Sequence, residues 1–446
     1  MKKIRNSMII FLALAALLPA GPAVRAFAQE VVTDNNIGVG ARAMGMGGAQ
    51  IGASEDVSAV IYNPAALTRI KLMQFQLGLD FLNKKVDTSL RSSKGVGDDG
   101  ATTDFSGLGT IGLAYPIPTE RGSLVFGIAY NRVKDFNGRF KTQGYSDILR
   151  GNFTGESIEE GGLGIYSLAG AVEVSPNVSV GASIDIWSGS YKRDNRQLLN
   201  DPNETYSQID ITGAEDDIQA VSLKPAFLYY VDKFRLGGFI RLPMTFHIDE
   251  DNYNEYYSRN DGGYFQLNEI IDPSSSFTDD AYTQHFRYKI EAPMQFGMGV
   301  ALGKQGKTVL AFDVSYEDWT QAKIEYPYDF APDPAYFLDK YRKTTTWSIG
   351  IEQPLPRIQG AVVRAGYISN PLVFKGPRSS DAGAPLIAVD NERDYVTFGF
   401  GAQHDPSFGL DVGYVHGFWT QDEGPRTDKE SHDRVFITVN YRSPLR

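Results

Sequence analysis

Residue types that commonly carry catalysis are present in this sequence, but their spacing does not fit a catalytic site. The five histidines contain no His-x-x-x-His pair and no other metal-ligand spacing; they are His247, His285, His404, His416 and His432. No Gly-x-Ser-x-Gly turn, which would present a nucleophilic serine, occurs. Gly38-x-Gly40-x-x-Ala43 looks like a dinucleotide fingerprint, but that motif needs a preceding strand and a βαβ unit. The sequence therefore predicts no enzyme and no cofactor.

One acidic stretch could hold a metal ion. Residues 249–261 are rich in Asp, Glu and Asn, whose oxygens suit calcium. The stretch lacks the spacing of a defined calcium loop, so a solvated loop is the alternative, and no metal is predicted.

Basic residues at alternate positions form the more informative set. Lys224, Arg235, Arg241, Arg287 and Lys289 fall on the predicted inner face of neighbouring strands, and Phe239 shares that face. One or two of these cations could pair with a carboxylate head group of a ligand. Glu291, Asp313 and Glu317 fall on the same face, so ion pairing among the residues themselves is the alternative.

The elements that would position these residues are long strands with alternating polarity. In residues 234–249 one parity carries Phe234, Leu236, Ile240, Leu242, Met244, Phe246 and Ile248, and the other is mostly polar. Residues 286–302 repeat the pattern. A transmembrane strand needs about 9–11 residues, whereas strands of soluble proteins are mostly about 5–6 residues long. These runs therefore predict strands whose apolar face contacts lipid.

The same alternation recurs along the chain and predicts an all-β fold, a 14-stranded antiparallel transmembrane barrel over residues 71–446. The predicted strands are 71–87, 104–117, 122–136, 161–174, 177–193, 216–231, 234–249, 285–302, 307–321, 343–353, 360–370, 392–404, 407–419 and 432–443. The connections alternate between short turns and long loops, as barrels with short periplasmic turns and long outer loops do. Both termini are then expected in the periplasm.

The N-terminus predicts export. Lys2, Lys3 and Arg5 precede an apolar run from Met8 to Leu18, and Ala26-Phe27-Ala28 follows as a cleavage site, so residues 1–28 are a predicted signal peptide. The run is shorter than the roughly 20 residues that span a bilayer, which disfavours an uncleaved anchor. The chain has no cysteine and a net charge of −11, which disfavours disulfides and nucleic acid as a partner.

Residues 29–70 show no strand alternation and are rich in glycine and alanine. They are predicted to form a small plug, or hatch, inside the barrel, with a flexible tail as the alternative. The predicted hatch residues are Gly45, Gly47, Gly48, Asn63, Pro64 and Ala65. A short helix is expected after Ser54, ending before Pro64.

Several of these segments resemble one known family. The stretch from Gly40 to Ala49 (GARAMGMGGA), then Glu55 to Ala59 and Asn63-Pro64-Ala65, is similar to the N-terminal hatch of the FadL/TodX transporters of long-chain fatty acids and hydrocarbons. Later stretches near Asp313, Val363 and Leu410 are also similar. The chain ends Ser443-Pro444-Leu445-Arg446, departing from the terminal aromatic usual in barrels, and Tyr441 is its last aromatic.

The resemblance implies a monomer in the bacterial outer membrane, in contact with its lipid, that takes up fatty acids or hydrocarbons passively. A ligand would be captured by outer loops, bind in the lumen, and leave sideways past the hatch. Aromatic loop residues such as Tyr257 and Phe265 are candidates for capture, with loop packing over the mouth as the alternative. A non-transporting barrel that binds secreted proteins, similar to PorV, is the competing function; a diffusion porin and a barrel lipase fit less well.

Overall fold

The computed structural model describes residues 38–146, 151–200, 207–259, 278–304, 306–325, 341–373, 387–389, 393–403, 405, 407–423 and 426–443. The predicted signal peptide, residues 1–28, lies outside these residues. No helix among the described residues is long and apolar enough to cross a membrane.

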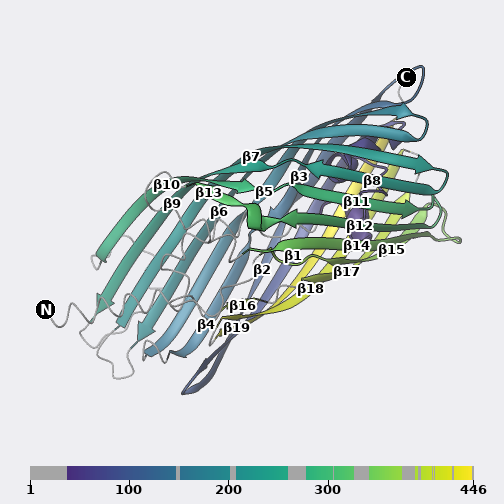
Figure 1. The fold of residues 1–446 in the computed structure, drawn as a ribbon. Coiled ribbons are helices and arrows are strands. Elements are labelled where there is room, and N and C mark those ends of the chain that lie inside the picture. The colour runs from purple at the N-terminus through teal and green to yellow at the C-terminus, as the bar shows by residue number, and fades with distance from the viewer. Residues whose placement is uncertain are drawn as a thin grey trace.

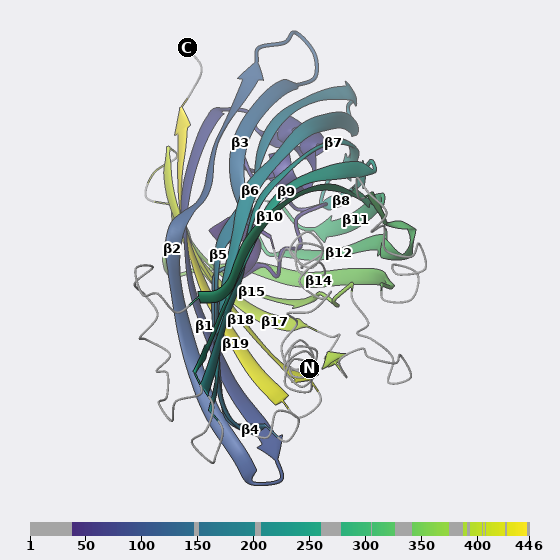
Figure 2. The same ribbon diagram turned by 90° about the vertical axis from the view of Figure 1, so that its left-hand side faces the viewer.

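The strands form one closed antiparallel barrel (Figures 1 and 2). The first strand, β1, pairs with the last, β19, from Met73↔Ser443 to Leu90↔Arg426, which closes the sheet. The wall has 14 strands, as predicted, because several of them are divided into two consecutive segments. The segments are β1 (Met73–Ser92), β2 (Gly95–Ile117), β3 (Leu124–Asp135), β4 (Gly138–Ser146), β5 (Gly151–Ser175), β6 (Val178–Asn200), β7 (Ser207–Val231), β8 (Phe234–Arg241), β9 (Met244–Arg259), β10 (Thr278–Ala292), β11 (Gln295–Leu302), β12 (Val309–Asp318), β13 (Lys323–Glu325), β14 (Lys343–Pro354), β15 (Ala361–Ser369), β16 (Ile387–Val389), β17 (Asp394–Gln403), β18 (Phe408–Glu423) and β19 (Arg426–Ser443).

Alternation along β1 shows how each strand serves two environments. Phe75, Leu77, Leu79 and Phe81 point outward and are exposed, whereas Asp80 between them is buried inside. Beyond Phe81 the pattern inverts: Leu82, Val86 and Leu90 are buried. The apolar outer face is thus confined to the part of the strand next to the short turns, as a lipid-facing band requires.

The prediction of long outer loops is wrong for several connections. Residues 88–103 form the ends of β1 and β2, and most of residues 137–160 form β4 and the start of β5. The strands extend because their ladders continue in register, as in Ser92↔Gly95 at the tip of the β1–β2 hairpin. The outward side chains of these extensions are mostly polar, so the sequence pattern predicts loop there. Figure 1 shows these strands extending well past the ends of β14 and β15.

Three neighbouring strands are broken at one level of the wall. β8 continues into β9 across Leu242-Pro243, and β11 continues from β10 across Pro293-Met294. The register is the same on both sides of the break, Arg241↔Gln295 and Met244↔Ala292, so the two prolines lie opposite each other. The next strand is interrupted by the 3₁₀ turn η3 (Trp319–Gln321) between β12 and β13. Proline has no N–H and cannot complete a ladder, which accounts for the breaks in the first two strands.

The side chains change faces at these breaks. Ile240 and Leu242 are exposed outside, but Phe246 and Ile248, of the same parity, are buried inside. The sequence prediction of one continuous lipid-facing parity across residues 234–249 and 286–302 is therefore wrong beyond the prolines. It fails because Leu242 and Pro243 are both exposed, so the alternation slips by one residue.

Candidate functional site

Residues 38–70, called the inner segment here, lie inside the barrel. They form α3 (Ala41–Gly45), α4 (Ala59–Tyr62) and the 3₁₀ helix η2 (Pro64–Arg69). Small side chains let the segment pack tightly: Ala41, Ala49, Ala53, Ala59 and Ala65 are fully buried. Its larger apolar side chains, among them Val60 and Leu67, pack against wall residues of β2, β3, β5 and β7.

A ring of wall glycines receives the inner segment. Each lies on the inner face of a different strand, where a Cβ atom would overlap an inner-segment atom. The ring, called the glycine ring below, comprises Gly112, Gly127, Gly181, Gly237, Gly299, Gly350, Gly366, Gly399 and Gly413. At Gly366 the overlap would be with the backbone of Met46 and Gly47. Backbone-to-backbone packing of this kind is possible only without side chains.

The structure places the predicted hatch glycines in this contact zone. A Cβ on Gly45 would lie 2.9 Å from Gly399 Cα. Gly47 has a φ of 65°, a conformation that favours glycine, and its amide donates to Thr397 Oγ1 at 3.0 Å. Gly48, with a φ of 72°, donates to Ala43 O at 2.8 Å.

Asn63-Pro64-Ala65 starts η2 and contacts the wall. The Asn63 side-chain oxygen accepts from Ala65 N at 3.1 Å, and Pro64 occupies the first turn, where a missing N–H costs nothing. The other end of the same amide donates to Ile51 O at 2.8 Å and to Phe227 O of β7 at 3.0 Å. The predicted helix is shorter than expected, since α4 begins at Ala59.

Buried charges hold the start of the inner segment to one side of the wall. Arg42 contacts Glu352 of β14 at 3.0 Å and Asp56 at 3.6 Å. Glu352 also binds Arg364 of β15 at 2.8 Å, and Arg364 binds Asp411 of β18 at 2.7 Å. This group, called the Arg42 cluster below, is almost entirely buried, so each charge depends on its partners.

Two further contacts join the segment to the opposite side. Arg235 of β8 binds Glu55 at 2.5 Å. Asp313 of β12 accepts from the amides of Gln50 and Ile51 at 2.6 and 2.7 Å. Arg235 and Asp313, both predicted to face the lumen, thus bind the inner segment.

A cavity of about 220 Å³ lies between the inner segment and the wall. Gly38, Val39, Gly47, Gly48, Ile51, Ile61 and Tyr62 line it from the inner segment. Wall residues on both sides of the strand break line it as well, including Arg241, Met244, Gln295, Glu317 and Trp319. The cavity therefore lies directly behind the broken strands.

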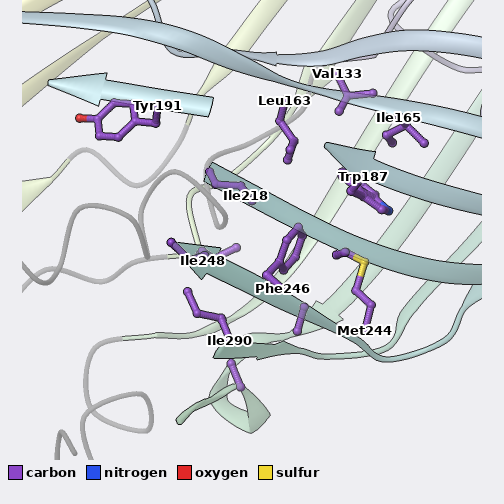
Figure 3. Close-up of a cluster of buried hydrophobic side chains, with 14 of the residues drawn as sticks. Val133, Leu163, Ile165, Trp187, Tyr191, Ile218, Met244, Phe246, Ile248 and Ile290 are labelled. Atoms are coloured by element: carbon purple, nitrogen blue, oxygen red, sulfur yellow. The ribbon is translucent and has the colours of Figure 1, made fainter. Parts of the chain in front are cut away.

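Trp187, Met244 and Phe246, which line the cavity, belong to a larger cluster of buried apolar side chains (Figure 3). Trp187 and Phe246 pack edge to face with ring centroids 5.9 Å apart, and Ile248, Tyr288 and Ile290 follow along β9 and β10. The side chains on β9 and β10 point inward because the strands change faces at Pro243 and Pro293.

Three of the predicted ligand residues line the cavity: Lys224, Phe239 and Arg241. Both cations are paired, Lys224 with Asp185 at 3.4 Å and Arg241 with Glu317 at 2.7 Å. Lys224 also donates to Ile61 O of the inner segment at 2.6 Å.

The other predicted ligand residues lie elsewhere. Arg287 and Lys289 do not share the inner face, as predicted, but point outward, because the alternation slips at Pro293; Arg287 is 74% exposed and pairs with Asp249. Tyr257 is buried among Leu198, Ile209 and Ile211 near the tip of β9, apart from the cavity. Phe265 lies outside the described residues.

Sequence reasoning missed the glycine ring and the Arg42 cluster. The ring had a readable signal, since nine of the strands each carry an inward glycine a few residues from a short turn. The Arg42 cluster had none, because Arg42 and Glu352 are 310 positions apart. Among the described residues no group of three or more acidic or histidine side chains could hold a metal ion.

Comparison with known proteins places this architecture in a family. A family model described as outer membrane protein transport protein (OMPP1/FadL/TodX) matches residues 20–443. No curated protein matches the chain significantly.

Solved structures share the fold. The toluene transporter TodX of P. putida is 14% identical with a TM-score of 0.61, covering 92% of this chain and 100% of that one. A FadL homologue of Pseudomonas aeruginosa is 13% identical with a TM-score of 0.58, covering 91% and 99%. The toluene transporter TbuX of Ralstonia pickettii is 12% identical with a TM-score of 0.55, covering 92% and 99%. The chain belongs to the OMPP1/FadL/TodX family of outer-membrane transport proteins.

Proposed function

We propose that this protein takes up small hydrophobic compounds passively across the bacterial outer membrane. The observation that carries the proposal is the cavity, which is enclosed by the inner segment on one side and by broken wall strands on the other. In this proposal the inner segment is the hatch, the short turns and both termini face the periplasm, and the protein acts as a monomer.

The apolar cluster around Trp187 and Phe246 is the proposed entry route. A hydrophobic molecule gains about 25 cal/mol for each Å² of apolar surface removed from water. The apolar cluster that contains Phe246, Ile248 and Ile290 therefore favours the passage of such a molecule down to the cavity. A wide aqueous pore would provide no such gain.

The strand break is the proposed exit into lipid. On the edge of β7 that faces β8 and β9, residues 220–225 have no ladder partner between Gln219↔His247 and Ala226↔Phe239, apart from the bond from Leu242 N to Leu223 O at 2.9 Å. Next to it Pro243 and Pro293 donate no hydrogen bond. Fewer bonds must therefore break here than elsewhere for the wall to part, and exposed Val221, Leu223 and Leu242 lie outside it. A molecule leaving sideways at this point would pass directly from the cavity into the membrane.

The size of the cavity favours single-ring compounds over long chains. An apolar cavity of ~150 Å³ holds benzene, and pockets for drug-sized ligands have about 300–1,000 Å³. The 220 Å³ cavity is closer to the first of these. Several structures of the same fold are described as toluene transporters or a monoaromatic hydrocarbon channel, which supports a substrate of this size. Long-chain fatty acids remain the second substrate class to test.

The test is uptake of labelled toluene and labelled oleate by cells that lack their own transporter of this family. We expect the full-length protein to accelerate toluene uptake. Ser315→Phe, which fills the cavity from β12, should abolish the acceleration, whereas Ser188→Phe, on the exposed outer face of β6, should not.

Equal uptake with and without the protein, despite correct insertion, would contradict transport. In that case a barrel that binds secreted proteins becomes the better reading, and a stoichiometric partner should then co-purify.

A further inference from the structure

Three residues that line the cavity each have a buried polar atom without a hydrogen-bond partner among the described residues. Asp313 Oδ1 is one of them and lies beside the wall glycine Gly299. The other two are Asp185 Oδ1, whose side chain is 1% exposed, and Arg241 Nε; these residues use their other atoms to bind Lys224 and Glu317. A buried unpaired polar atom is costly, so Asp185 Oδ1 and Arg241 Nε suggest that a ligand supplies the missing partners.

The two atoms need complementary partners. Asp185 Oδ1 is an acceptor and needs a donor, whereas Arg241 Nε carries a hydrogen and needs an acceptor. Trp187 is close to both residues: Asp185 precedes it by two positions on the same inner face of β6, and the Arg241 guanidinium lies 5.5 Å from the Trp187 ring centroid. A hydroxyl group is one group that both donates and accepts.

The charges around the cavity are balanced. Its lining has three cations, Lys134, Lys224 and Arg241, and three acids, Asp185, Asp313 and Glu317. A carboxylate ligand would therefore find no free cation in the Lys224 and Arg241 pairs, and it would face the Asp185 carboxylate. A like charge held this close in a buried site is unfavourable.

The remaining lining has two different sides. Trp187, Phe239 and Phe246, on β6, β8 and β9, supply aromatic and apolar surface. Ser315, Thr344, Thr346 and Ser348, farther along the wall on β12 and β14, supply hydroxyl groups. This division fits a molecule that is apolar on one side and weakly polar on the other.

We propose that the cavity selects uncharged, hydroxyl-bearing single-ring compounds. The ring packs against Trp187 and Phe239, and the hydroxyl donates to Asp185 Oδ1 and accepts from Arg241 Nε. Asp185 and Arg241 are then specificity-determining residues, and Glu317 is a positioning residue that neutralises Arg241. This inference rests on the proposed function, since it names the substrate class of the same cavity.

The experiment compares toluene, benzyl alcohol and benzoate, which differ only in the group on one carbon. Binding to the purified full-length protein in detergent is measured by equilibrium dialysis. The Ser315→Phe variant is measured in parallel, so that partition into detergent is subtracted. We expect benzyl alcohol to bind about tenfold more tightly than toluene, because toluene leaves both polar atoms unpaired. Benzoate should bind most weakly.

Glu317→Gln provides the second arm. It leaves Arg241 without its counter-charge, so benzoate affinity should rise about tenfold while toluene affinity stays the same. The matched control is Glu430→Gln, which removes an acid from a buried wall pair with Lys84 away from the cavity. It should leave the order of the three compounds unchanged.

The outcomes separate this inference from the proposed function. Toluene or benzoate binding as tightly as benzyl alcohol, in a manner that Ser315→Phe abolishes, would overturn the hydroxyl preference and leave the transport cavity in place. No binding of any compound beyond that of Ser315→Phe would overturn the inference, and the uptake experiment then decides independently whether the protein transports.

Discussion

The inner segment contacts the wall all round through the glycine ring. Beyond that ring, two sides of the barrel differ in how closely the segment packs against the wall. On the β15–β19 side α3 packs directly on the wall, with Ala41 and Met44 against Val415 and Phe436. From β6 to β14 the cavity lies between the segment and the wall, and the strands from β8 to β13 are broken. The first side is built for fixed contact, whereas the second keeps space and a weak ladder.

The difference indicates how a closed barrel can pass a hydrophobic molecule without becoming a pore. In the proposed mechanism, fixed contact along one side would keep water and ions from crossing the lumen. Space and missing hydrogen bonds on the other side would let a molecule enter and leave while the seal stays in place. Three variants test this division, beginning with the one expected to have the largest effect.

Gly366→Ala should damage the fixed side most. The added methyl group would overlap the backbone of Met46 and Gly47, which cannot move without shifting the inner segment. We expect a leaky barrel, measured as a large rise in single-channel conductance in planar bilayers. Gly409→Ala is the control, because its Cβ would lie 3.8 Å from the nearest atom, Ala402 O. Equal conductance of the two variants would contradict the role assigned to the glycine ring.

Arg42→Gln should weaken the same side by a smaller amount. Removing one partner of a buried ion pair costs about 3–5 kcal/mol, because the remaining charges stay buried without compensation. We expect faster hydrogen exchange of the amides in residues 41–53 while the wall stays protected. The control is Arg139→Gln, which breaks a wall pair with Glu156 whose arginine is 44% exposed. Unchanged exchange in Arg42→Gln would show that packing alone holds α3.

The double substitution Pro243→Ala and Pro293→Ala should affect only the other side. Each alanine supplies an N–H that can complete the ladder, so parting of the wall becomes harder. We expect substrate uptake to fall by a few-fold with no change in conductance. Pro354→Ala, at the short-turn end of β14, serves as the control. Uptake that stays at the wild-type rate would move the proposed exit away from this break.

Much of the wall could be predicted from sequence because a two-residue period is a local signal. Alternation in segments such as 177–193 and 407–419 located all 14 strands without knowledge of their partners. It failed where a local exception reverses the pattern, as at Pro243, and where polar residues continue a strand, as at residues 88–92.

The site was predicted only in part, because it depends on contacts between distant residues. Parity alone predicts Lys224, Phe239 and Arg241 on the inner face, where they line the cavity; their role as ligand contacts stays a prediction. Their counter-charges Asp185 and Glu317 come from other strands. The neutral character of the cavity, which bears on its substrate, therefore appears only once the barrel is closed.

The uneven height of the wall has a consequence for what meets this protein from outside. β7 has 25 residues and β15 has 9, so at about 3.3 Å per residue the first is ~80 Å long and the second ~30 Å. The hydrocarbon layer needs only about 30 Å. With the short turns toward the periplasm, as proposed, one side of the barrel projects far above the lipid. That projecting side is the part that an antibody or a bacteriophage would reach first, and its polar surface can change without touching the cavity.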